Sequence, residues 1–121
     1  EWSFTGRIFP AAEALAGGLV RSVHAPDELL PAARALAAEI ADNTSAVSVT
    51  LTRQMLWRML GAEHPMIAHP ADSRAIHALG TSPDVREGVL SFLEKRPPEF
   101  TGKPSTDVPD VFPGWIEPEF E

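Results

Sequence analysis

The sequence predicts a mostly α-helical chain that opens with a short strand-helix-strand segment. Two observations carry this prediction: apolar residues between positions 26 and 96 recur at the spacing of amphipathic helices, and serines, prolines and glycines stand where helices begin and end. The 121 residues are 44% hydrophobic and 22% charged, as in ordinary folded domains. Because six of the twelve prolines follow position 96, we expect the compact part to end near Arg96.

The first 24 residues are predicted to form one short β-α-β unit. We expect a turn at Thr5-Gly6, a short apolar strand, a helix from Pro10 to Ala16 and a second strand after Gly17-Gly18. Proline suits a first helical turn, where its missing N–H is not needed, and a glycine pair suits a helix end. The second strand is predicted from apolar and β-branched residues, which are Leu19, Val20 and Val23.

Two amphipathic helices are predicted next, over residues 26–42 and 45–60. Asp27 and Glu28 stand in the opening turn of the first, where acidic groups complement the helix dipole. Asn43-Thr44-Ser45 then provides a break and a fresh cap. The apolar stripes comprise Leu29, Leu30, Ala33, Leu36, Ala37, Ile40 and Ala41 in the first helix, and Val49, Leu51, Met55, Leu56, Met59 and Leu60 in the second.

Two further helices, over residues 66–79 and 83–96, complete a four-helix region. Ser82 is expected to cap the last helix, with Pro83 in its first position, and Pro97-Pro98 forbids its continuation. An extended tail follows. Because this tail holds many apolar residues, we expect it to lie against a surface; they are Val108, Val111, Phe112, Trp115 and Phe120.

The charge and the residue usage exclude several classes of protein. A formal charge of −7 repels phosphate groups and anionic headgroups, so neither nucleic acid nor a membrane is expected as a partner. The absence of cysteine excludes disulfides, thiolate nucleophiles and zinc ribbons, and fits the cytoplasmic location that we expect. No apolar run approaches the roughly 20 residues of a spanning helix. The first residues lack an initiator Met and a signal-peptide pattern, which we interpret as an internal position in a longer chain.

A metal site is not expected. The histidine spacings of five and eight residues do not give the i, i+4 pair of a metal-binding helix, so these side chains are expected to form surface or interface hydrogen bonds. The potential ligands that this spacing argument covers are His64, His69, His77 and Asp72.

Other candidate groups have simpler interpretations. Glu63 beside His64, and Glu87 beside Arg86, are interpreted as solvated helix faces, because neither carboxylate has a second group placed to perturb its pKa. Gly17-Gly18 is interpreted as a turn, since no phosphate-loop pattern surrounds it.

Two apolar and basic clusters remain. Met55, Trp57 and Met59 are expected in a core or a subunit interface rather than in a ligand pocket. Lys95-Arg96 beside Phe92 either meets a phosphate or complements the helix dipole, and both interpretations stay open.

Two motifs at opposite ends of the chain, with helices of matching number and length between them, resemble the C-terminal half of the enoyl-CoA hydratase/isomerase (crotonase) superfamily. The proline-rich tail is similar to that of a long-tailed bacterial subset. The matching residues are Thr5-Gly6-Arg7-Ile8, Ala11, Glu13-Ala14-Leu15 and Gly18-Leu19-Val20, then Asp84, Arg86-Glu87-Gly88, Phe92-Leu93-Glu94-Lys95-Arg96, Pro97-Pro98 and Phe100, and in the tail Ser105-Thr106-Asp107-Val108-Pro109 and Phe112-Pro113-Gly114-Trp115.

The resemblance implies an α/β fold built on a ββα-spiral. Residues 1–24 are then the end of the spiral core, residues 25–96 a helical trimerisation region and residues 97–121 an extended tail. The implied partners are an N-terminal spiral half and further copies in a homotrimer or dimer of trimers. Pro65, Pro70 and Asp72-Ser73-Arg74 depart from the general family pattern.

The resemblance also implies an acyl-CoA enzyme, and enoyl-CoA hydratase is the activity that we expect first. The family's oxyanion hole and carboxylates lie upstream of the Thr5-Gly6 motif, so no catalytic residue is expected here and this chain alone is expected to be inactive. Coenzyme A arrives with the substrate, and no separate cofactor is implied. Phe92 and Lys95 match residues that reach the adenine and phosphate end of coenzyme A bound mainly by a neighbouring subunit.

Alternatives stay open within and outside the family. Isomerase, dehalogenase or hydrolase chemistry is compatible with the same segments, because the implied catalytic half sets the reaction. A non-enzymatic helical module that serves only to oligomerise is the alternative from another class. The matching glutamates, which are Glu13, Glu87 and Glu94, are implied to be structural.

Overall fold

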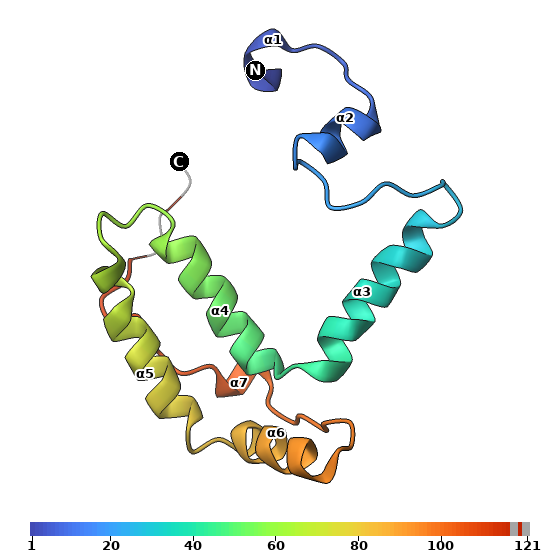
Figure 1. The fold of residues 1–121 in the computed structure, drawn as a ribbon. Helices are drawn as coiled ribbons and strands as arrows, with labels where there is room; N and C mark the ends of the chain where they lie inside the picture. The colour runs from blue at the N-terminus through green and yellow to red at the C-terminus, as the bar shows by residue number, and fades with distance from the viewer. Residues whose placement is uncertain (117–118, 120–121) are drawn as a thin grey trace. The chain divides into compact units, whose positions relative to one another are not determined.

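The computed structural model describes residues 1–116 and 119, and every regular element in them is helical (Figure 1). Contacts divide the chain into two compact units, Glu1–Glu39 and Ile40–Glu121, with the boundary inside α3. The elements are α1 (Trp2–Thr5), α2 (Ala11–Ala16), α3 (Leu29–Asn43), α4 (Ala46–Met59), the 3₁₀ turn η1 (Pro65–Ile67), α5 (His69–Leu79), α6 (Pro83–Glu94) and α7 (Pro104–Asp107).

The predicted strand-helix-strand start is wrong for both strands. A strand exists only when a second strand completes its hydrogen-bond ladder, and the described residues offer none to either segment. Ile8 is accordingly fully exposed, and Leu19 is 61% exposed. The single turn α1 replaces the predicted turn at Thr5-Gly6, and it ends because Gly6 adopts a left-handed conformation, with φ of 60°.

Polar and aromatic contacts tie α1 to α2. The Trp2 indole N–H donates to Glu13 Oε1 at 2.9 Å, and the Trp2 ring stacks on Phe9 with centroids 4.4 Å apart. Arg7 forms ion pairs with Glu1 and Glu13. Hydrogen bonds from Arg7 and then from Trp2 lower the pKa of Glu13 to about 2.

Helix α3 begins one turn later than predicted. Residues before Leu29 form a tighter turn, in which the Glu28 N–H donates to the Ala25 carbonyl at 3.0 Å. No residue of α3 is buried, although its apolar stripe is present as predicted. The exposed large side chains are Leu29, Leu30, Leu36 and Ile40.

The core of the second unit forms where α4, α5 and the tail meet. Ser45 caps α4 as predicted, because its Oγ accepts the Ser48 N–H at 3.3 Å. Met55 and Met59 pack against this core, which confirms their core interpretation, whereas Trp57 is 72% exposed. The buried residues of the cluster are Val47, Leu51, Ala71, Ala75, Val111 and Phe112.

The third predicted helix is divided into two pieces. A 3₁₀ turn over Pro65–Ile67 precedes α5, which starts at His69 rather than at Met66. Pro70 stands in the first turn of α5, where its missing N–H is not needed. His64 Nδ1 accepts the Met66 N–H at 3.1 Å, so this histidine caps the 3₁₀ turn.

The tail is not wholly extended, because Pro104–Asp107 forms the short helix α7. Its predicted packing is confirmed for Val111 and Phe112, which are 1% and 9% exposed within the core. The Arg58 guanidinium lies 4.5 Å from the Phe112 ring centroid and 4.9 Å from that of Trp115. Phe120, also named in the tail prediction, lies outside the described residues.

Across residues 1–116 and 119, no helix is both long enough and apolar enough to cross a bilayer.

Candidate functional site

Helix α6 ends at the two residues that the sequence singles out for binding: Phe92 lies in its last turn, and Lys95 directly follows it. It begins as predicted: Ser82 Oγ accepts the Val85 N–H at 3.2 Å, and Pro83 occupies the first turn. It ends at Glu94, two residues before the predicted end at Arg96.

The two faces of α6 differ in burial. The inner face carries small or polar residues at spacings of four and three, and Asp84 and Ser91 on it are buried. The Phe100 ring lies against Gly88 on the same face. The outer face is an exposed apolar stripe made of Val85, Val89, Phe92 and Leu93, in which Phe92 is 81% exposed.

Asp84 joins the start of α6 to two other segments. Its Oδ2 accepts a hydrogen bond from Ser45 Oγ at 2.6 Å, and its Oδ1 accepts the Thr101 and Gly102 N–H groups at 3.0 and 3.1 Å. Burial acts to raise the Asp84 pKa, but the hydrogen bonds from Ser45 and the two amides together hold it below its ordinary value. The carboxylate is fully engaged and serves to hold α6 in place.

The end of α6 has an unusual backbone. Lys95 has φ of 56° and ψ of 42°, and it is the only non-glycine residue with positive φ in the described part of the chain. The Lys95 N–H donates to the Phe92 carbonyl and the Arg96 N–H to the Ser91 carbonyl, which is the Schellman arrangement. A left-handed conformation costs a residue other than glycine about 1 kcal/mol. Because such backbone strain is more frequent at functional sites, the conformation of Lys95 favours a functional role for this residue.

Hydrogen-bonded charged groups connect the two sides of this turn at Lys95, which is called the reversal below. Arg96 Nη1 and Nη2 donate to Glu87 Oε1 and Oε2 at 2.5 and 2.9 Å, and the Glu99 N–H donates to Glu87 Oε1 at 2.8 Å. The Arg96 side chain and then the Glu99 amide lower the pKa of Glu87 to about 2. The interpretation of Glu87 as unperturbed is therefore wrong, because its partner is not the adjacent Arg86 but Arg96, nine residues away.

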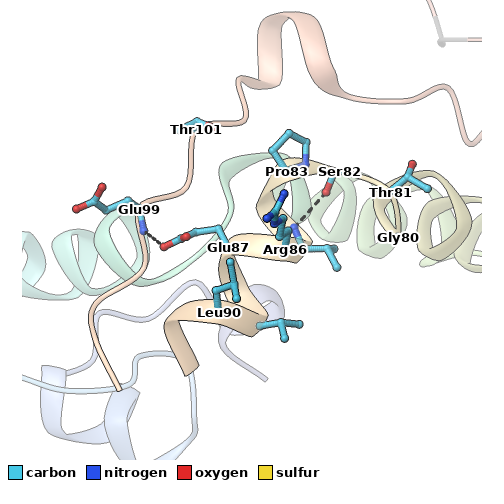
Figure 2. A pocket seen from close by; sticks show the side chains of 11 residues that line it. Gly80, Thr81, Ser82, Pro83, Arg86, Glu87, Leu90, Glu99 and Thr101 are labelled. Carbon is cyan, nitrogen blue, oxygen red and sulfur yellow. Dashed lines mark hydrogen bonds between the residues drawn. The ribbon is translucent and has the colours of Figure 1, made fainter. Parts of the chain in front are cut away.

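An open groove of about 760 Å³ runs beside the first half of α6 and is bordered by Glu99 and Thr101 (Figure 2). Figure 2 shows the Glu87 side chain directed at the Glu99 amide and the Ser82 hydroxyl directed into the cap of the helix. Both polar groups are thus committed to structural hydrogen bonds. The groove offers no pair of groups arranged for acid and base catalysis among the described residues.

The remaining sequence candidates are not brought together. His64, His69 and His77 are exposed, and no set of three metal-ligating side chains occurs in the described portion of the chain. Gly17-Gly18 ends α2 as a turn, with Gly18 at φ of 75°, as predicted.

Sequence reasoning missed the Glu87–Arg96 pair and the contacts of Asp84. A signal was available, since Asp84, Glu87 and Arg96 all belong to the closing motif of the resemblance. Their pairing was hidden because it crosses the reversal at Lys95, which simple helical spacing does not anticipate.

Comparison with known proteins gives a family match over most of the chain. The model of the enoyl-CoA hydratase/isomerase family matches residues 1–103. An enoyl-CoA hydratase of Alternaria alternata is 42% identical over 97 residues, which are 79% of this chain and 32% of the relative. A probable enoyl-CoA hydratase of Mycobacterium leprae is 36% identical over 99 residues, 80% of this chain and 37% of the relative.

A solved structure agrees with these relatives. The crystal structure of a probable enoyl-CoA hydratase/isomerase from Mycobacterium abscessus superposes with a TM-score of 0.76 at 29% identity. The match covers 83% of this chain and 41% of that chain. This chain spans about a third of the length of the curated relatives named above.

Proposed function

Because the chain belongs to the enoyl-CoA hydratase/isomerase family, we propose that it is the C-terminal part of a crotonase-fold enzyme that acts on acyl-CoA thioesters. The observation that carries this proposal is the family match over residues 1–103, supported by identities of 36 to 42% to the two hydratases. The catalytic groups of the proposed enzyme lie elsewhere in a longer protein, since the described residues bring no acid and base together.

Hydration of a 2-enoyl-CoA is the proposed reaction. The names of the relatives support hydratase, while the name of the Mycobacterium abscessus structure keeps isomerase as the second candidate. In a hydration, water adds across the 2,3 double bond while fixed N–H donors stabilise the charge that develops on the thioester oxygen. The part proposed for this chain is to bind the coenzyme and to build the assembly.

Phe92 and Lys95 are the proposed coenzyme A contacts. The Phe92 ring is 81% exposed at the end of α6, where it offers an apolar wall to an adenine ring. Among the contacts of the described residues, none engages the Lys95 ammonium, which leaves a point charge for a phosphate group. Both residues stand within one turn of the strained reversal.

A homotrimer, or a dimer of trimers, is the proposed assembly. The exposed apolar stripe of α6 supports it, because Val89 and Leu93 would be left in contact with water in a monomer. Light scattering on the intact protein measures the assembly. A monomer at micromolar concentration would contradict it.

The function is tested by assaying the longer protein and the 121-residue chain side by side. We expect the longer protein to consume crotonyl-CoA, followed as loss of enoyl-thioester absorbance, and the 121-residue chain to show no turnover. A 3-enoyl-CoA given as the alternative substrate identifies an isomerase. A longer protein that forms oligomers but turns over neither substrate would support the non-enzymatic module instead.

A further inference from the structure

The reversal at the end of α6 is fastened at both sides of Lys95. Glu87 lies on the helix, before the reversal, and its carboxylate accepts donors from two residues that follow it. Arg96 supplies two parallel N–H groups at 2.5 and 2.9 Å, and Glu99 supplies its backbone N–H at 2.8 Å. The Arg96 Nη1 also donates to the Pro97 carbonyl at 3.1 Å, which adds a fourth link to the same turn.

This geometry does more than an isolated surface ion pair. A two-pronged arginine–carboxylate pair fixes relative orientation as well as distance. The pair spans the one described non-glycine residue with positive φ, a conformation that persists only when its surroundings enforce it. The Glu87 side chain is 18% exposed and that of Arg96 is 37% exposed, so water competes weakly at the carboxylate.

We propose that Glu87 and Arg96 are positioning residues, which hold the reversal so that Lys95 and Phe92 are presented together to the phosphate and adenine of coenzyme A. This inference rests on the proposed function. Neither Glu87 nor Arg96 touches the coenzyme in this proposal; each acts through the backbone of the turn. Glu94, which meets Arg96 Nε at 2.6 Å, is 56% exposed and supports the arginine from the helix side.

The sign of one substitution separates positioning from simple electrostatics. Glu87→Ala removes a negative charge near the proposed phosphate site, and on charge alone this change strengthens binding of an anionic ligand and lowers KM. Loss of positioning has the opposite sign. We expect Glu87→Ala in the longer protein to raise KM for acyl-CoA about 3- to 10-fold with kcat unchanged, since the contact is remote from the thioester.

Matched variants complete the test. Glu87→Gln keeps one acceptor oxygen for Arg96 Nη1 and the Glu99 N–H but loses the acceptor for Arg96 Nη2, so it should raise KM less than Glu87→Ala does. Glu63→Ala removes an exposed carboxylate elsewhere and should leave KM unchanged. If Glu87→Ala does not fold, Arg96→Lys, which keeps the charge but not the two-pronged pair, is expected to raise KM in its place. A lowered or unchanged KM in Glu87→Ala, or in Arg96→Lys where that variant replaces it, overturns the inference.

A double-mutant cycle distinguishes failure of the inference from failure of the proposed function. Lys95→Ala alone should raise KM, and adding Glu87→Ala should then raise KM less than it does in the wild type, because only Phe92 is left to be positioned. If Lys95→Ala leaves KM unchanged at low salt, the proposed coenzyme contact fails. If Lys95→Ala raises KM but the two effects multiply independently, the contact stands and the positioning role is overturned.

Discussion

The two units of the chain use apolar residues with opposite results. In Ile40–Glu121, six buried residues from α4, α5 and the tail make a core. In Glu1–Glu39, all of which the structure describes, Ala14 is the one buried hydrophobic residue, while Phe4 and Ile8 are 98% and 100% exposed. An apolar pattern becomes a core only where the same chain provides a covering element. The first unit has the apolar residues, but no element of the described chain covers them.

The largest expected effect is in the core of the second unit. Leu51 is 1% exposed, so Leu51→Ala should lower the free energy of unfolding by about 3 kcal/mol, from lost burial and the cavity left behind. Leu60→Ala, at the exposed end of α4, is the matched control and should change it by less than about 0.5 kcal/mol. Denaturant unfolding measures both. Equal losses would show that this core is not the stabilising centre.

The next largest effect is expected at the exposed residue Ile8 of the first unit, and its size should differ between the 121-residue chain and the longer protein. In the 121-residue chain, Ile8→Ala should change stability by less than about 0.5 kcal/mol, because Ile8 is fully exposed. In the longer protein, where the proposed spiral core covers this residue, the same change should cost about 2 kcal/mol. Thermal unfolding of both pairs decides. Small losses in both proteins would mean that the longer chain leaves Ile8 uncovered.

Close backbone packing distinguishes the second unit further. A Cβ atom on Gly102 would lie 2.6 Å from Asp84 Oδ2 and 2.9 Å from Val47 Cγ2. Gly102→Ala should therefore destabilise the protein by about 2 kcal/mol, as overpacking does. Gly61→Ala, where a Cβ meets nothing within 4 Å, should be neutral in the same unfolding experiment. A neutral Gly102→Ala would show that Asp84 moves easily.

Strain within the well-packed unit gives a smaller effect of the opposite sign. Lys95→Gly removes the left-handed penalty and should stabilise the protein by about 0.5 to 1 kcal/mol, while Lys95→Ala should be close to neutral. Both should raise KM for acyl-CoA about 3- to 10-fold in the longer protein, less so at high salt. Unfolding and saturation curves report the two properties separately. Stabilisation without a change in KM would mean that the strain serves no binding role.

The smallest effect concerns Glu13 in the first unit and Glu87 in the second, because an arginine lowers the pKa of each carboxylate in the same way. The pKa of Glu13 and of Glu87 is lowered from 4.5 to about 2, by Arg7 and Arg96 respectively. A lowered pKa adds stability that is complete above about pH 4.5 and is lost as pH falls through about 2. Carboxyl NMR titration should show that Arg96→Ala raises the pKa of Glu87 and leaves that of Glu13 low. A pKa of Glu87 that stays near 2 would exclude Arg96 as its cause.

The sequence predicts the parts of this fold that local chemistry decides. Ser45 and Ser82 begin helices as expected, because a hydroxyl on the preceding residue satisfies an N–H that the helix cannot. The strands around Ile8 and Leu19 are absent because strand pairing depends on a partner that no local pattern supplies. The interpretation of Glu87 was wrong for a related reason, because its partner Arg96 follows a residue in the left-handed conformation. A glycine in the sequence indicates that such a conformation is possible, whereas a lysine does not.

The core of the second unit also constrains synthesis. A ribosome delivers Leu51 sixty residues before Val111, and at typical elongation rates the interval is about 3 to 12 s. Helices form in microseconds, so α4 has an uncovered side for most of that time, and α5, which is complete at Leu79, for about the second half of it. A nascent chain halted before Phe112 therefore presents chaperones and proteases with an open apolar face, and a message truncated there would yield a degradation substrate rather than a shorter protein.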